Sequence, residues 1–141
     1  MVIAWTFTGA MYCWLLKTDW KICYLNSGHF KKVSDVRWGN NGKFLLSSSK
    51  DQTTRVYAHI KENKNLNLLK NWKEISWAQI HGYDINSIAT LKVNDDCPNM
   101  LVCGADEKIL WILEPIPHFV NSFNVLTDNE FRLNVKIDEE E

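Results

Sequence analysis

Asp51-Gln52-Thr53-Thr54-Arg55-Val56-Tyr57, together with the earlier pair Gly28-His29, is the segment that most clearly indicates the fold. Between them lie the turn dipeptide Asn41-Gly42 and the serine run Ser47-Ser48-Ser49. Asn-Gly is a strong hairpin signal because both residues tolerate a positive φ. Apolar residues recur with a period near two around this turn, as strands require. We therefore predict short strands over residues 33–38, 44–49 and 53–57.

This arrangement resembles a WD repeat, a unit of four short strands that forms one blade of a β-propeller. Trp14 and Tyr57 lie 43 residues apart, which agrees with the ~40–45 residues of that repeat type. A single blade cannot bury its own core and must stack against neighbours. The predicted fold is therefore all-β, a partial WD-repeat β-propeller with about two and a half blades of a larger ring. The resemblance to WD repeats implies that the complete ring is seven-bladed.

The predicted organisation has four parts. Residues 1–27 end a preceding blade with its strands c and d, and residues 28–80 form a WD blade with an inserted loop near 59–70. Residues 81–123 form a second, less regular WD blade, in which His81-Gly82 reverses the usual order. Residues 124–141 begin the next element or form a frayed acidic end.

The chain therefore looks like an internal piece of a larger propeller, and its terminal blades lack neighbours. Such blades present unpaired strand edges and apolar faces, which invite association with other chains. We expect the isolated chain to be poorly soluble or oligomeric.

Composition excludes several classes of function. With 45% hydrophobic and 23% charged residues the chain is globular, and its formal charge of −1 argues against a protein built around phosphate-backbone attraction. The four cysteines form no Cys-x-x-Cys pair, so we predict free thiols in a reducing compartment and no metal site. No stretch approaches the ~18 apolar residues of a membrane span. We predict no cofactor and no membrane anchor.

The predicted site is a buried hydrogen-bond network in the blade of residues 28–80. In a propeller blade, a histidine before the first strand can bond to a serine on the second, an aspartate in the following turn and an aromatic residue on the third. The candidates are His29, Ser47 or Ser49, Asp51 and Tyr57. Ser, His and Asp also form hydrolase triads, but no Gly-x-Ser-x-Gly elbow presents a nucleophile. We therefore predict a structural network and no enzyme activity.

The second blade offers a weaker version of this network. Its candidates are His81, Asp84 and Asp106. The interval from Asp106 to Leu113 is one residue longer than that from Asp51 to Tyr57, so Glu107 is an alternative to Asp106 for the turn position.

The inserted loop holds four lysines, Lys61, Lys64, Lys70 and Lys73, together with Trp72. These residues could offer charge and a stacking surface to RNA. The alternative is a solvated loop whose leucines and Trp72 dock onto the outer strand.

Four stretches carry a more specific resemblance: residues 27–30, 51–56, 79–84 and 104–108. Their order and spacing are similar to those of the WD-repeat subunit family of the Elongator complex, over about Trp5 to Phe123. A departure is Trp111, which stands where that family tends to have a basic residue.

The resemblance implies a non-catalytic scaffold in the cytoplasm and nucleus. The implied partners are the other Elongator subunits, which together modify the wobble uridine of tRNA through a different, catalytic subunit. Contact with tRNA would be indirect or weak, and no small-molecule substrate is implied. The alternative is an unrelated WD-repeat adaptor in another assembly.

Overall fold

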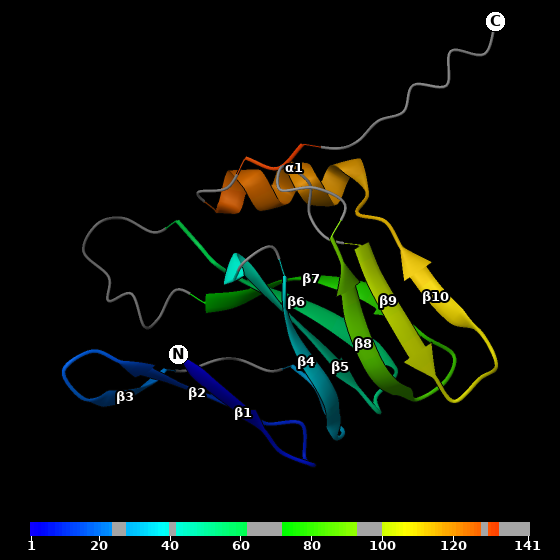
Figure 1. The fold of residues 1–141 in the computed structure, drawn as a ribbon, viewed down its shortest axis with the longest axis horizontal. Helices are drawn as coiled ribbons and strands as arrows, with labels where there is room; N and C mark the ends of the chain where they lie inside the picture. Colours follow the sequence, from blue (N-terminus) through cyan, green and yellow to red (C-terminus); the bar gives the residue numbers. More distant parts are fainter. Residues whose placement is uncertain (24–27, 40–41, 62–71, 93–99, 128–129, 133–141) are drawn as a thin grey trace, which may run out of the picture.

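In the computed structural model, three antiparallel sheets follow one another along the chain, and one helix follows the third sheet (Figure 1). The structure describes residues 1–23, 28–39, 42–61, 72–92, 100–127 and 130–132. The described part is therefore all-β apart from one helix, as expected for consecutive blades of a partial propeller.

The first and second sheets correspond to residues 1–23 and 33–80. The first has the order β1-β2-β3, with β1 at Val2–Trp5, β2 at Met11–Leu16 and β3 at Trp20–Cys23. The second has the order β4-β5-β6-β7, with β4 at Val33–Gly39, β5 at Phe44–Ser49, β6 at Thr53–His59 and β7 at Trp72–Ile80.

The third sheet has the order β10-β9-β8, with β8 at Ile85–Leu91, β9 at Met100–Ala105 and β10 at Leu110–Leu113. Helix α1 spans Pro117–Leu126. No helix among the described residues is long and apolar enough to cross a membrane.

Two strands differ from the sequence predictions. The first sheet contains β1 in addition to the two predicted strands, because its run Val-Ile-Ala-Trp pairs antiparallel with β2 despite lacking a polar alternation. The outer strand β7 begins at Trp72, so Lys73 belongs to a strand paired with Ala58 and not to the inserted loop. Most of that loop, residues 62–71, lies outside the described residues.

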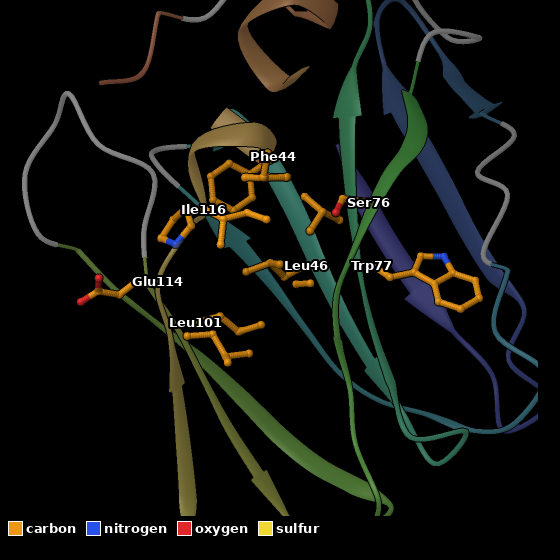
Figure 2. Close-up of a pocket in the computed structure, with 12 residues that line it drawn as sticks. Phe44, Leu46, Ser76, Trp77, Leu101, Glu114 and Ile116 are labelled. Carbon is orange, nitrogen blue, oxygen red and sulfur yellow. The ribbon is translucent and has the colours of Figure 1, made fainter. Parts of the chain in front are cut away.

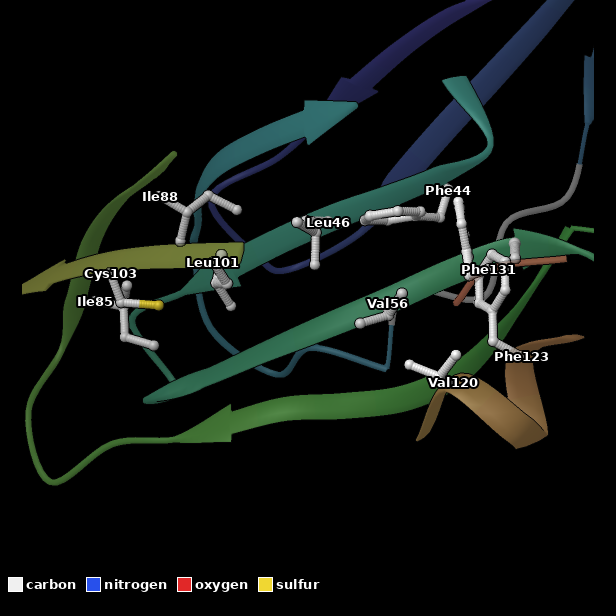
Figure 3. Packing of buried hydrophobic residues seen from close by; sticks show 11 residues of the cluster. Phe44, Leu46, Val56, Ile85, Ile88, Leu101, Cys103, Val120, Phe123 and Phe131 are labelled. Atoms are coloured by element: carbon white, nitrogen blue, oxygen red, sulfur yellow. The ribbon is translucent and has the colours of Figure 1, made fainter. Parts of the chain in front are cut away.

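The second sheet is buried on both faces. Because successive residues of a strand point to opposite faces, they contribute alternately to two hydrophobic cores. Leu45 and Tyr57 face the first sheet, where they pack with Met11, Cys13 and Val33. The intervening positions face the third sheet and α1 in a cluster that Figure 3 shows: Phe44, Leu46, Val56, Ala58, Ile85, Ile88, Leu101, Cys103, Val120, Phe123 and Phe131. Each sheet thus buries the face of its neighbour, as propeller blades do.

Helix α1 was not predicted, and it crosses the expected boundary between residues 123 and 124. Pro117 at its start favours a helix N-terminus and cannot donate to a sheet ladder. The ring of Phe123 lies edge-on to Phe44, with centroids 5.8 Å apart. Burial of this aromatic face holds the helix over the core between the second and third sheets, at one end of their strands (Figure 1).

Polar contacts also join the second and third sheets. The carboxylate of Asp35 accepts the backbone N–H of Ile88 at 3.2 Å, and Arg37 Nε donates to the carbonyl of the same residue at 3.2 Å. Because one strand residue is held at both its N–H and its C=O, the stacking of β4 on β8 has a defined register.

The outer faces of the first and third sheets expose apolar side chains. Trp14 pairs with Ile22 and Leu16 with Trp20, on the face opposite the buried Met11 and Cys13. On the third sheet, Leu110, Trp111 and Ile112 are all exposed. These faces are those that further blades would cover.

Candidate functional site

His29 is the centre of a buried network in the second sheet. Its Nδ1 lies 2.9 Å from Asp51 Oδ2, and its Nε2 lies 2.7 Å from the Ser47 hydroxyl. His29 precedes β4, Ser47 lies on β5, and Asp51 occupies the turn from β5 to β6, so three segments meet at one ring. The side chains of His29 and Asp51 have no solvent exposure.

The protonation states follow from burial and hydrogen bonding. Burial lowers the pKa of His29, and the opposing effect of Asp51 does not offset it. Burial alone would raise the pKa of Asp51, but hydrogen bonds from Thr53, His29 and the Phe30 backbone lower it overall. A neutral His29 that donates Nδ1–H to an ionised Asp51 satisfies both groups, and its Nε2 then accepts the Ser47 O–H.

The structure distinguishes the two serine candidates. Ser47 bonds to His29, and it is also the hydrogen-bond partner of the Tyr57 hydroxyl, whose pKa burial raises. Ser49 instead accepts the backbone N–H of Asp51 at 3.0 Å and donates to the carbonyl of Lys31 at 3.2 Å. Ser47 therefore belongs to the chain from Tyr57 to Asp51, while Ser49 holds the backbone beside it.

Sequence reasoning missed Thr53, which completes the shell of Asp51. Its hydroxyl donates to Asp51 Oδ1 at 2.6 Å and its backbone N–H to the same oxygen at 3.0 Å. Gln52 between them has a φ of 70°, which places the chain in the tight turn that brings these groups together. The signal was an aspartate followed two positions later by threonine, a common side-chain-to-backbone turn.

A second polar cluster on the same sheet was also missed. The buried Arg55 donates through Nη1 to both carboxylate oxygens of Glu74 at 2.9 Å, and its guanidinium lies 4.5 Å from the centroid of the Trp77 ring. Gly28 packs against this pair with a φ of 62°, and a Cβ there would lie 2.1 Å from Arg55 Nη1. The positive φ favours glycine before the histidine, and any larger residue there would also push against the ends of the Arg55 and Glu74 side chains.

The third sheet has only part of the network. The buried His81 ring lies edge-on to Trp111, and Glu107 Oε1 is 3.2 Å from its Nε2, close enough for an ion pair but outside hydrogen-bond geometry. Trp111 Nε1 donates to the same carboxylate at 2.7 Å. Glu107, and not Asp106, therefore takes the position beside the histidine.

Asp106 and Asp84 have other contacts. The Asp106 side chain is exposed, accepts from Asn86 and lies 3.8 Å from Lys50 Nζ. Asp84 contributes its backbone carbonyl, which accepts the N–H of Asp106 at 3.1 Å. The prediction that Asp106 joins His81 in a network is wrong, because its side chain contacts Asn86 and Lys50 while Glu107 lies beside the ring. A side-chain role for Asp84 stays a prediction.

Strand register explains why this network is incomplete. Ser47 pairs with Arg55, and Cys103 pairs with Trp111 at the equivalent place. Cys103 thus stands where Ser47 stands in the second sheet. Its thiol is a weak hydrogen-bond donor, and burial raises its pKa to about 11. Leu113 stands where Tyr57 stands in the second sheet, and its side chain has no hydroxyl group.

The predicted basic loop is only partly described. Lys61 is exposed after β6, Lys73 is exposed on β7, and Lys64 and Lys70 lie outside the described residues. Lys61 therefore follows the end of β6, whereas Lys73 lies within β7, the strand paired with β6.

The arrangement holds structure in place and does not present reactive groups. Ser47 is completely buried, so a substrate cannot reach its hydroxyl. A pocket of about 150 Å³ lies on the opposite side of this sheet, between the second and third sheets, and is lined mainly by apolar residues such as Phe44, Leu101 and Ile116 (Figure 2). Among the described residues, no group of three His, Cys, Asp or Glu side chains could hold a metal ion.

Residues 20–58 match the WD40 family, described as WD domain, G-beta repeat. This range runs from β3 to β6. The sequence repeat is therefore offset by one strand from the four-stranded sheet, since it includes β3 and omits β7.

Among curated proteins, the chain is similar to Elongator complex protein 2 of Rattus norvegicus, with 36% identity over 131 residues, 90% of this chain and 15% of that protein. The protein of the same name from Homo sapiens is 35% identical, with 90% and 15% coverage. That from Arabidopsis thaliana is 33% identical, with 87% and 15% coverage. The chain thus spans about 15% of the length of these relatives.

Proposed function

We propose that this chain, as a member of the WD-repeat family of Elongator complex protein 2, acts as a protein–protein interaction scaffold in an Elongator assembly. The observation that carries the proposal is that the His29, Ser47, Asp51 and Tyr57 side chains are buried and bonded to one another. These four groups hold the blade together, and we propose that the segment takes no part in catalysis.

The surface of the molecule supports this role. The outer faces of the first and third sheets expose aromatic and aliphatic side chains, which further blades would cover. A segment that continues into neighbouring blades builds a large rigid body, and such bodies bind partners on their surfaces. The partners proposed here are the other Elongator subunits.

We further propose that the assembly served by this scaffold modifies the wobble uridine of tRNA, in the cytoplasm and nucleus. Contact of this segment with tRNA is proposed to be indirect or weak, because its formal charge is −1 and phosphate binding needs an excess of basic residues.

The test is affinity purification of the tagged chain, in its native sequence context, from its own cells. Recovery of the other Elongator subunits in constant ratio is expected. An Asp51→Ala variant should recover less as its blade loosens, whereas Asp19→Ala in an exposed hairpin serves as the control. Recovery of none of these subunits by the wild-type protein would refute the proposal. A fluorescent fusion seen in neither cytoplasm nor nucleus would refute the location.

A further inference from the structure

The buried network holds in place an exposed loop that the proposed function leaves without a role. This loop, residues 29–32, connects the first sheet to β4 and lies beside the turn of residues 6–10 between β1 and β2. We propose that the loop and the turn form a docking surface for an acidic protein segment that carries an apolar anchor side chain. The inference rests on the proposed scaffold function, because it names the surface through which the scaffold binds.

Three successive residues of the loop are held by their backbones. The N–H of Phe30 donates to Asp51 Oδ2 at 3.1 Å, the carbonyl of Lys31 accepts the Ser49 hydroxyl at 3.2 Å, and the carbonyl of Lys32 accepts the N–H of Lys50 at 2.9 Å. A surface loop fixed in this way loses little conformational entropy when a partner binds. The network therefore prepares the loop for binding.

The turn of residues 6–10 is packed directly against the loop. Gly9 has a φ of 91°, and a Cβ at this position would lie 2.6 Å from the His29 carbonyl oxygen and 2.7 Å from that of Lys31. The turn is closed by a hydrogen bond from the N–H of Thr6 to the carbonyl of Ala10 at 2.9 Å. Two loops from different sheets thus form one surface.

This surface exposes two aromatic side chains. Phe7 is 78% exposed and Phe30 is 69% exposed, the largest exposed fractions among the described aromatic residues. Neither ring is needed to fill a core, since both lie outside the two buried clusters. Exposed aromatic rings on a rigid backbone are typical of residues that anchor a protein partner in a pocket or against an apolar side chain.

The charge of the surface selects the partner. Lys31 and Lys32 are both exposed, and neither the loop nor the turn contains an acidic residue. Electrostatic complementarity favours a negatively charged segment. Two lysines are few for a nucleic-acid site, which needs several phosphate contacts, and the rings suit an apolar anchor. The observations therefore favour an acidic peptide segment over RNA.

The test uses the labelled chain and an array of overlapping 15-residue peptides from the other Elongator subunits. The bound peptides are expected to be net negative and to contain an aromatic or branched aliphatic residue. Phe30→Ser, and the double variant Lys31→Glu with Lys32→Glu, should each weaken binding by about tenfold or more.

Matched controls separate this surface from general stickiness and charge. Leu110→Ser removes an equally exposed apolar side chain from the third sheet, and Lys17→Glu with Lys43→Glu changes the same charge at the opposite end of the sheets. Both controls should retain binding within about twofold, well below the effect of losing an anchor residue. Absence of bound peptides, preference for basic peptides, or equal losses in the controls would overturn the proposal, as would displacement of the peptides by tRNA.

Co-purification distinguishes the two proposals. If the wild-type protein and the Lys31→Glu, Lys32→Glu variant recover the Elongator subunits equally, the scaffold stands and the docking surface is wrong. If the wild-type protein recovers none, the scaffold proposal fails, whereas the peptide array still reports on the surface.

Discussion

Replacing Asp51 with alanine removes the acceptor around which one turn and one loop are built. The carboxylate accepts the N–H groups of Phe30 and Thr53 at 3.1 and 3.0 Å, the Thr53 hydroxyl at 2.6 Å and His29 Nδ1 at 2.9 Å. Alanine leaves all four donors without this partner, and the His29 side chain at their centre has no solvent exposure. The buried donors of His29 and Thr53 lose their acceptor in a place shielded from water.

The magnitude follows from these donors. Each buried donor left unsatisfied costs about 1–3 kcal/mol, and a hydrogen bond to a charged group such as the Asp51 carboxylate contributes about 1.5–3 kcal/mol. Four donors lose this acceptor, but the turn can relax and admit water, so we expect Asp51→Ala to lower the free energy of unfolding by about 3–5 kcal/mol in total. That is a large part of the ~5–15 kcal/mol typical of a domain.

The assay is equilibrium urea unfolding, followed by tryptophan fluorescence. Asp19→Ala changes an exposed aspartate and should alter the free energy by less than about 0.5 kcal/mol. A double-mutant cycle with His29→Ala should give a coupling of about 1–3 kcal/mol, since the two side chains are in direct contact. A loss below about 1 kcal/mol, or full additivity of the two substitutions, would refute the reasoning.

Three further outcomes are expected in the same unfolding assay. Burial lowers the pKa of His29 from its usual 6.5. Below that pH the unfolded chain therefore binds a proton that the folded histidine does not, and this destabilises the fold. The urea concentration at the unfolding midpoint should fall as the pH is lowered from about 7.5 to about 5.5, and His29→Gln should reduce this fall. An unchanged wild-type midpoint would contradict it. Glu74→Ala leaves the buried Arg55 guanidinium without its carboxylate and should cost about 3 kcal/mol, more than Glu74→Gln; equal losses would show that the charge is unimportant. Phe123→Ala removes the ring that packs on Phe44 and should cost about 3–5 kcal/mol, with α1 exchanging amide protons faster; unchanged exchange would show that the helix is held by other contacts.

The alternation of residues and the turn chemistry were enough to predict most of the second sheet. The hairpin signal Asn41-Gly42 and the aspartate turn at Asp51 mark where strands end, and the observed β5 spans the predicted residues 44–49. These signals are local, so they can be read without the fold. The match to WD repeats over residues 20–58 covers this same region.

The elements that were missed depend on contacts between distant segments. Helix α1 is directed by the burial of Phe123 against Phe44, and its own residues show no acidic first turn and no side-chain cap. The choice of Glu107 over Asp106 depends on how β10 places Trp111 beside His81. No local pattern carries such information, because adjacent residues differ only in the face to which they point.

Spacing and turn chemistry are properties of the chain, so the stacked strands and the pairing of His29 with Asp51 could be predicted before the fold was known. What the network holds in place depends on how the sheets pack together. The folded structure shows that Asp51 accepts the backbone of Phe30, that Gly28 makes room for the Arg55 ion pair, and that two loops from different sheets meet at Gly9. Those outcomes depend on through-space distances between separate strands, which burial of the two cores sets.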